Sequence, residues 1–421
     1  MKIKLIPLFL LLFSATLLYA QDSTSIPVLS KRDSMQMEFY KKERDIRDVF
    51  RHSKKAHQQS VDSETESKAG KYLFSIVPAA GYTLQTGFAA ILSANLAFYN
   101  STASDQKLSN IATSITYSQY EQTIIPFTVN IWTKNNKFNI ISDNRYIEYP
   151  SDIYGLGGVR LSVPLADSIA NSAYTVNFSG LKLHETFMAR VAKNTYLGAG
   201  IFYDQFWNIN ALDSLHRNMA RLLSRNLGTS EMAVGMAFRF LYDSRLNQIN
   251  SENGWYANLL FRPNFKFMGS DENWNGLQTD VRWYTHFPKD SKNVLAFWNF
   301  NWLTLGAQQP PFLLLPSTGW DDQYNTGRGY IQGRFRGKDM VYYENEYRFR
   351  LTNNGLLGGV IFGNIEYFSP SYVNQKDILS VGYGLGLRIK INKYSGTNLC
   401  VDYGFGENGS RGFFVNLGEV F

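Results

Sequence analysis

From residue 72 to residue 421, apolar and polar residues alternate along short segments, which is the pattern of β-strands with one face against an apolar phase. Residues 109–119, 381–391 and 399–405 show this alternation clearly. One face carries Ile, Leu, Val, Tyr or Phe, whereas the other carries Gly, Ser, Asn or charged residues. Strands of a soluble sandwich also alternate, but their polar faces seldom carry Gly together with Arg and Lys. The pattern therefore favours a barrel wall between lipid and a polar lumen.

The alternation divides into sixteen segments, and single-chain bacterial barrels have an even number of strands. The predicted strands are residues 73–80, 87–99, 107–119, 122–133, 136–147, 171–192, 195–208, 230–243, 254–267, 276–287, 293–305, 340–351, 357–367, 379–391, 396–405 and 411–421. Tight turns alternate with long outer loops, the longest of which are residues 148–169, 209–231 and 306–339. The sequence thus predicts an all-β fold, a 16-stranded antiparallel transmembrane β-barrel. Two alternatives remain open: the first two strands are merged, and residues 209–232 contain a short helix.

Two segments precede the strands. Residues 1–20 begin with Lys2 and Lys4, continue with an apolar run and end in Ala20, which is the pattern of a signal peptide. Residues 21–71 are polar and charged, with helical spacing of apolar residues over 34–52, and predict a short periplasmic arm that is partly helical or disordered. The arm is either a solvated linker or a helix that plugs the barrel or docks a partner. Residues 72–421 form the barrel domain.

Composition agrees with this organisation. Aromatic residues make up 15% of the chain, with 26 Tyr and 30 Phe, while the mean hydropathy is negative. Helical membrane proteins are more apolar and soluble proteins less aromatic, whereas barrels combine a lipid-facing half with aromatic girdles. A Tyr-rich secreted sandwich is the alternative. The net charge of +7 is modest and spread along the chain, so it favours contact with outer-membrane lipid and lipopolysaccharide over nucleic acid.

The sequence carries little catalytic chemistry. It has no nucleophile elbow, phosphate-binding loop or metal-ligand spacing, and its five His are scattered. A phospholipase in a barrel needs Ser, His and a carboxylate or Asn that converge at the rim, and His184 is the only strand His with many polar neighbours. We therefore expect no enzymatic activity, no cofactor and no metal, with hydrolysis of phospholipid or ester substrates as the competing hypothesis.

Residues 327–338 contain four Gly and four basic residues in twelve positions, which predicts a basic, bendable loop between two strands. Arg334, Arg336 and Lys338 form its basic segment. Such a loop needs acidic partners, and the strand that follows offers them. Its period of two places Tyr343 and other apolar residues on one face, and Glu344, Glu346, Arg348 and Arg350 on the other.

Several Gly-rich segments, in the same order along the chain, resemble the BamA/TamA (bacterial surface antigen) family of outer-membrane assembly barrels. They are residues 154–157, 242–245 with 254–256, 328–338 with 346–349, 383–388, 401–406 and 412–421. Family members that insert or secrete proteins carry periplasmic docking modules, called POTRA domains. Residues 21–71 are too short for one, so the resemblance covers the barrel alone and leaves client insertion open.

The resemblance implies that the sixth outer loop folds into the lumen and is latched there by its Arg. Carried over to this sequence, the latch is Arg328 with Gly329 and Tyr330. Asp402 is the first expected counter-charge, because alternation already places it inside, and Glu346 is the second. A guanidinium meets a carboxylate with two parallel hydrogen bonds, so one Arg suffices to fix a loop.

The last predicted strand fits the assembly signal of such barrels. Alternation places Phe413, Val415, Leu417, Glu419 and Phe421 on one face. The resemblance implies an accessory role in outer-membrane protein assembly or export, in the bacterial outer membrane, with other outer-membrane or periplasmic assembly proteins as partners. The alternative is a passive pore or structural barrel without insertase activity.

Overall fold

The computed structural model describes most of the predicted barrel domain and a short part of the arm. The described residues are 43–49, 72–83, 86–101, 106–154, 174–211, 227–245, 247–321, 325–369, 377–393 and 396–421. The predicted signal peptide, most of the arm and the alternative helix within 209–232 lie outside these ranges. Of the predicted arm helix, α3 (Ile46–Val49) is described. In the described part of the chain, no helix is long and apolar enough to cross a membrane.

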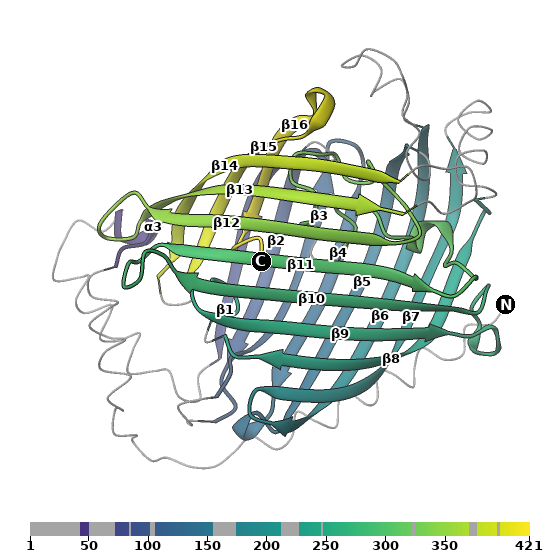
Figure 1. Cartoon of the computed structure of the whole chain (residues 1–421), viewed down its shortest axis with the longest axis horizontal. Helices are drawn as coiled ribbons and strands as arrows, with labels where there is room; N and C mark the ends of the chain where they lie inside the picture. The colour runs from purple at the N-terminus through teal and green to yellow at the C-terminus, as the bar shows by residue number, and fades with distance from the viewer. Residues whose placement is uncertain are drawn as a thin grey trace.

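The strands follow one another in a single sheet, from β1 to β16, and each is antiparallel to the next (Figure 1). They are β1 (Leu73–Thr83), β2 (Gly87–Phe98), β3 (Ser109–Ser118), β4 (Thr123–Trp132), β5 (Phe138–Ile153), β6 (Tyr174–Ala192), β7 (Thr195–Ala211), β8 (Glu231–Asp243), β9 (Gly254–Asn264), β10 (Trp274–His286), β11 (Val294–Leu305), β12 (Met340–Arg350), β13 (Leu357–Phe368), β14 (Ile378–Asn392), β15 (Thr397–Phe405) and β16 (Arg411–Leu417). The prediction of an all-β, antiparallel fold is confirmed, and the first two strands are separate.

Two strand boundaries differ clearly from the prediction. β5 continues to Ile153 because its last residues stay paired with β6, as far as Ile153 opposite Tyr174. β16 ends at Leu417, since Gly418 has a φ of +96° and turns the chain away from the sheet. In both cases the neighbouring strand or the turn decides the boundary, which a strand's own alternation does not reveal.

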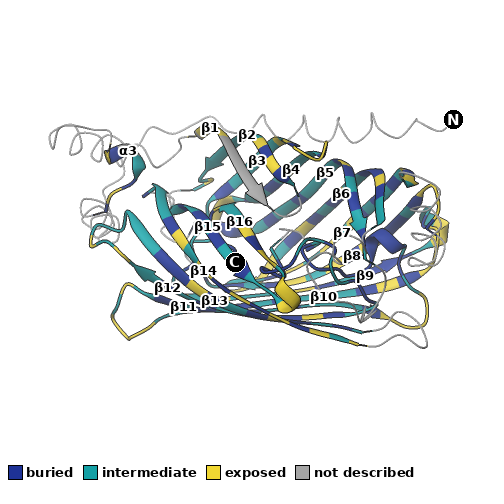
Figure 2. Ribbon diagram, turned by 90° about the horizontal axis from the view of Figure 1, so that it is seen from above, coloured by how far each residue is buried: buried dark blue, intermediate teal, exposed yellow. Residues whose placement is uncertain are grey.

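The sheet curves so that its two halves face each other. Figure 1 shows β8 to β14 as one wall in front of β2 to β7, and Figure 2 shows the same arrangement from above. β1 and β16 approach each other. No hydrogen-bonded ladder between them occurs among the described pairings, so closure of the barrel stays a prediction.

The outer face of the sheet is apolar. On β14 the outward residues alternate with buried small or charged ones (Figure 2). The outward residues of this strand are Leu379, Val381, Tyr383, Leu385 and Leu387, and all five are exposed. The alternation predicted for β12 is confirmed as well, since Tyr343 is exposed and both Glu344 and Glu346 are buried. A continuous exposed apolar face of this kind is typical of a surface that contacts lipid or protein.

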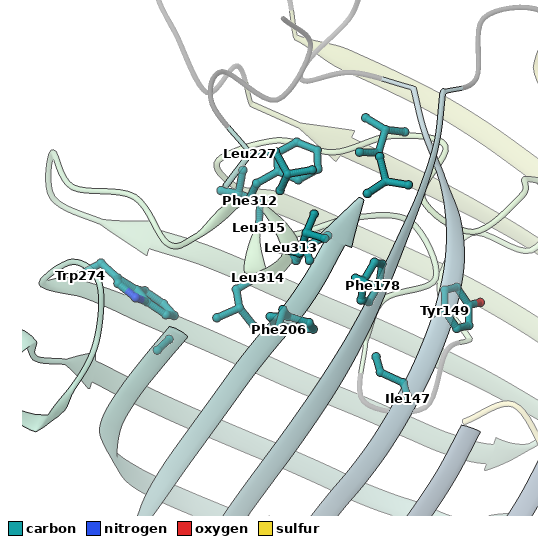
Figure 3. Close-up of a cluster of buried hydrophobic side chains, with 14 residues drawn as sticks. Ile147, Tyr149, Phe178, Phe206, Leu227, Trp274, Phe312, Leu313, Leu314 and Leu315 are labelled. Carbon is teal, nitrogen blue, oxygen red and sulfur yellow. The ribbon is translucent and has the colours of Figure 1, made fainter. Parts of the chain in front are cut away.

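Two hydrophobic clusters lie inside the curve. One joins the ends of β5 to β8 to the connection between β11 and β12 (Figure 3). The other gathers aromatic residues of β10, β11 and β12 around the last two residues of the chain, Val420 and Phe421. The interior is therefore partly filled by the connection between β11 and β12 and by the end of the chain.

Candidate functional site

The connection between β11 and β12 is described over residues 306–321 and 325–339. It is held inside the curve of the sheet at two places. The first is an apolar anchor, which we call the foot: residues Phe312 to Leu315, including the one-turn helix η3 (Phe312–Leu314). Figure 3 shows the foot against Phe206 and Phe178 of the β5–β8 wall. Each side chain of the foot is at most 8% exposed. Burying four large apolar groups favours docking by several kcal/mol in total.

Two oppositely charged side chains hold the backbone of the foot. The Glu231 carboxylate accepts hydrogen bonds from the backbone N–H groups of Phe312 (3.1 Å) and Leu313 (2.9 Å). The Arg336 guanidinium donates to the carbonyl oxygens of Phe312 (2.8 Å) and Leu315 (3.4 Å). Burial lowers the pKa of Arg336 to about 10, with Glu231 acting in the opposite direction, so the guanidinium remains charged at neutral pH.

The second anchor of the loop is Arg328, which is 1% exposed. Its Nη1 donates to Asp402 at 2.5 Å, and its Nη2 donates to both Glu344 and Glu346. The guanidinium also lies 3.7 Å from the centre of the Phe362 ring. Burial opposes the charged form, but the three carboxylates outweigh it and raise the pKa of Arg328 well above its usual range.

The carboxylates around Arg328 belong to a larger ionic network. Arg348 donates to Glu346 at 2.6 Å, and Arg388 pairs with Asp402 and, at 2.8 Å, with Glu419. Each side chain of this network is at most 8% exposed. Because every charge has an opposite neighbour, the network tolerates burial, but removal of one member leaves its partners unpaired.

The backbone around Arg328 is fixed to β13, β14 and the turn between β15 and β16. Asn364 donates to the Arg328 carbonyl at 2.9 Å, and Ser410 donates to the Gly329 carbonyl at 2.7 Å. The Tyr330 hydroxyl donates to the Val381 carbonyl at 2.7 Å. Burial is the main reason why the pKa of Tyr330 rises to about 12, so the hydroxyl keeps its proton. The loop is thus bound by main-chain contacts as well as by charge.

Gly404 permits the close approach of the loop to β15. A Cβ at this position would lie 2.7 Å from the Gly329 nitrogen and 3.0 Å from the Gly329 Cα. Gly329 itself has a φ of +117°, which side chains disfavour. The loop also approaches β14 closely, since a Cβ at Gly382 would lie 2.6 Å from the Arg328 carbonyl oxygen.

We expect Gly404→Ala to destabilise the folded protein by about 1–3 kcal/mol, because the added methyl group overpacks the loop backbone. Thermal unfolding in detergent micelles measures the effect. Gly363→Ala on β13 is the matched control, since the nearest atom to its added Cβ is 3.9 Å away. Equal melting temperatures of the two variants would contradict close packing of the loop on β15.

The other basic residues of the loop do not pair with carboxylates of the following strand. Arg334 lies 5.1 Å from the Tyr154 ring, Arg336 binds the foot, and Lys338 donates to the Gly306 carbonyl at 2.9 Å. The expectation that acidic residues of β12 balance the whole basic segment is therefore wrong beyond Arg328. The reason is geometric, because these three side chains contact Tyr154, the foot and Gly306 and not the carboxylates on the inner face of β12.

The last residues divide into two groups. Phe413 and Leu417 are exposed on the outer face and Val415 is partly exposed, whereas Phe421 is 4% exposed and stacks on Trp298 inside the sheet. The prediction that Phe421 shares a face with Phe413 is wrong, and so is the placement of Glu419 on the greasy face. Gly418 turns the chain inward, which brings Glu419 to Arg388.

Sequence reasoning brought Arg328, Asp402 and Glu346 together but missed other members of the network. The sequence places Glu344 on the inner face of its strand without indicating a role. The alternation over 381–391 likewise indicates no role for Arg388, and that it lies opposite Cys400, two residues from Asp402, follows only from the register of β14 and β15. Asn364 and Ser410 gave no signal, because isolated polar residues are common on barrel strands and turns.

The segment 242–245 forms a second buried charge group at the turn between β8 and β9. Arg245 donates to both oxygens of Asp243, at 3.0 and 3.3 Å, and lies 4.3 Å from the Tyr256 ring. Lys107 lies 3.6 Å from Asp243. Of residues 154–157, only Tyr154 is described.

No family model matches the sequence, and no curated protein does. Solved structures are similar in fold. CdiB from Acinetobacter baumannii matches 83% of this chain and 66% of its own, with a TM-score of 0.51 and 10% identity. BamA from Haemophilus ducreyi, lacking POTRA domains 1–3, matches 89% of this chain and 80% of its own, with a TM-score of 0.49 and 14% identity. The outer-membrane protein Wzi from Escherichia coli, described as a carbohydrate-binding β-barrel involved in group 1 capsule assembly, matches 88% and 90%, with a TM-score of 0.33 and 10% identity.

The similarity to CdiB concerns the class of fold. The chain spans about two thirds of the length of CdiB and shares with it the fold of an antiparallel β-barrel. At 10% identity the likeness concerns the fold alone. Membership of the BamA/TamA family stays a prediction that rests on the segments quoted above.

Proposed function

We propose that this chain is an integral β-barrel of the bacterial outer membrane, closed by pairing of β1 with β16, with residues 306–339 folded into its lumen. The exposed apolar outer face supports a lipid environment, because a water-soluble protein rarely exposes a surface of this extent. The buried charge network inside supports a polar lumen. Lipid and lipopolysaccharide are then its immediate surroundings.

We further propose that the barrel is an accessory in outer-membrane protein assembly or export. The observation that carries this proposal is the docking of Arg328 on Glu344, Glu346 and Asp402, because these contacts involve the segment on which the resemblance to assembly barrels rests. A loop held inside the barrel at two places also disfavours the alternative of a passive pore, since the foot and Arg328 bind different walls.

Depletion of the protein in its native bacterium tests the role. We expect the amounts of several other outer-membrane proteins to fall, while inner-membrane proteins stay constant, and we expect the protein itself to fractionate with the outer membrane. Quantitative mass spectrometry of separated membranes measures both. Unchanged levels of all other outer-membrane proteins after full depletion would leave a structural barrel or pore as the better description.

A further inference from the structure

The described part of the arm is attached to one rim of the sheet. We call residues Glu43–Val49 the strap. It lies against the turn between β12 and β13, residues 351–356, and against Lys393 at the end of β14. With the arm in the periplasm, as the sequence predicts, this rim is periplasmic, because β1 starts from the same side.

The strap binds the rim through its acidic side chains and its backbone. Glu43 pairs with Arg350 at 2.6 Å, and Asp48 pairs with Lys393 at 2.9 Å. Asp45 accepts a hydrogen bond from the backbone nitrogen of Lys393 at 3.2 Å. The three carboxylate residues are at most 9% exposed. The strap is therefore recognised by its acids at positions 43, 45 and 48.

The backbone and the charges of the rim fit the strap. The backbone nitrogen of Arg44 donates to the Asn354 carbonyl at 2.8 Å, which fixes the register of the strap. Gly355 has a φ of +67°, and a Cβ there would collide with the Glu43 carboxylate. A cavity beside Gly355 is lined by several cations, namely Lys292, Arg348, Arg350, Arg388 and Lys390. Only two carboxylates, Glu252 and Glu419, line the same cavity.

The strap lacks an apolar anchor. Val49 is 56% exposed, and Ile46 is only partly buried. An attachment built from ion pairs and hydrogen bonds, without a buried hydrophobic centre, is weaker than an interface with aromatic or aliphatic hot spots. Because strap and rim belong to one chain, an effective concentration on the order of millimolar is enough to keep such a contact occupied. A competitor with the same acidic pattern is then able to exchange with it.

We propose that this basic rim is a docking site for an acidic protein segment, and that the strap is its built-in occupant, which an acidic segment of a partner protein displaces. The partner carries carboxylates spaced as Glu43, Asp45 and Asp48 are, with a free backbone N–H beside the first. Only the compartment of the partner rests on the proposed function. Binding to purified protein is independent of the depletion experiment, so failure of one is distinguishable from failure of the other.

Two measurements on the purified full chain in detergent test the proposal. In the first, a fluorophore on Val49→Cys reports the mobility of the strap, while the native Cys400 is buried and does not compete for the label. We expect high anisotropy in the otherwise unchanged chain and a clear fall when Glu43→Gln and Asp48→Asn are added. High anisotropy in both would overturn an attachment through these acids.

In the second measurement, a labelled capped peptide with the sequence of residues 43–49 is titrated into unlabelled protein. We expect at least about tenfold tighter apparent binding to the Glu43→Gln, Asp48→Asn variant than to the unchanged chain, because the strap no longer occupies the rim. Adding Arg350→Ala and Lys393→Ala should abolish binding, and a peptide with Gln and Asn in place of the acids should not bind. Equal binding to all variants, or no binding to the vacated rim, would overturn the proposal. An unchanged folded band on gels verifies that each variant is folded.

Discussion

Arg328→Ala is expected to lower the stability of the folded barrel by about 3–5 kcal/mol, because removal of the guanidinium leaves Glu344 buried without its cation. Glu346 and Asp402 each lose one of their cations and keep Arg348 and Arg388, respectively. The measurement is the temperature at which the compact band of unheated protein on a denaturing gel is lost. We expect this temperature to fall markedly. The loop should also become accessible to trypsin, because its backbone contacts with the sheet form only while the Arg328 side chain holds the loop in place.

Two variants test whether the effect belongs to the guanidinium. Arg328→Lys keeps the charge but lacks the planar guanidinium, and one ammonium cannot donate to three carboxylates in the same geometry. We therefore expect an intermediate loss of stability. Arg334→Ala is the matched control in the same loop, because the described contacts of Arg334 are with aromatic rings. A folded band of Arg328→Ala as heat-resistant as that of Arg334→Ala would refute the latch.

Leu315→Asp is expected to release the foot and open a steady ion path through the lumen. Leu315 is 2% exposed, and the substitution both removes apolar burial and places a charged group in a cluster of buried apolar side chains, at a cost of about 3 kcal/mol or more for docking of the loop. Planar-bilayer recordings measure the outcome. We expect a largely silent trace from the unchanged protein and sustained current from the variant.

The matched control for the foot is Gln308→Asp, which introduces the same charge at an exposed position of the same loop. It should leave the recordings silent. If Leu315→Asp also remains silent while the protein is folded by circular dichroism, the foot does not close the lumen. If the unchanged protein already conducts steadily, the passive-pore alternative gains support over an occluded barrel.

The strands were predictable because their signal is local. A period of two along a strand reveals which residues face lipid and which face the interior, and this holds for β12 and β14 without knowledge of their neighbours. Strand ends were less predictable. The end of β5 depends on pairing with β6, and the end of β16 depends on the backbone conformation of Gly418.

The site was predictable in part. Alternation and the family resemblance pointed to Arg328, Asp402 and Glu346, and the structure places these three in contact. Nothing in the sequence linked Glu231 with the foot, because they are about eighty residues apart and neither belongs to a recognisable motif. The contact of Glu43 with Arg350 was equally hidden, since charged residues of an arm normally remain solvated.

By itself, the sequence determined the class of secondary structure, the two faces of each strand and the identity of the loop that carries the basic residues. These properties follow from residue type and spacing alone. Only the tertiary structure decided which carboxylates surround Arg328, where the foot binds, that the chain turns inward after Leu417, and that the strap attaches to the rim. The physical reason is that each of these contacts joins segments distant in sequence, and the register and curvature of the whole sheet set the distance between them.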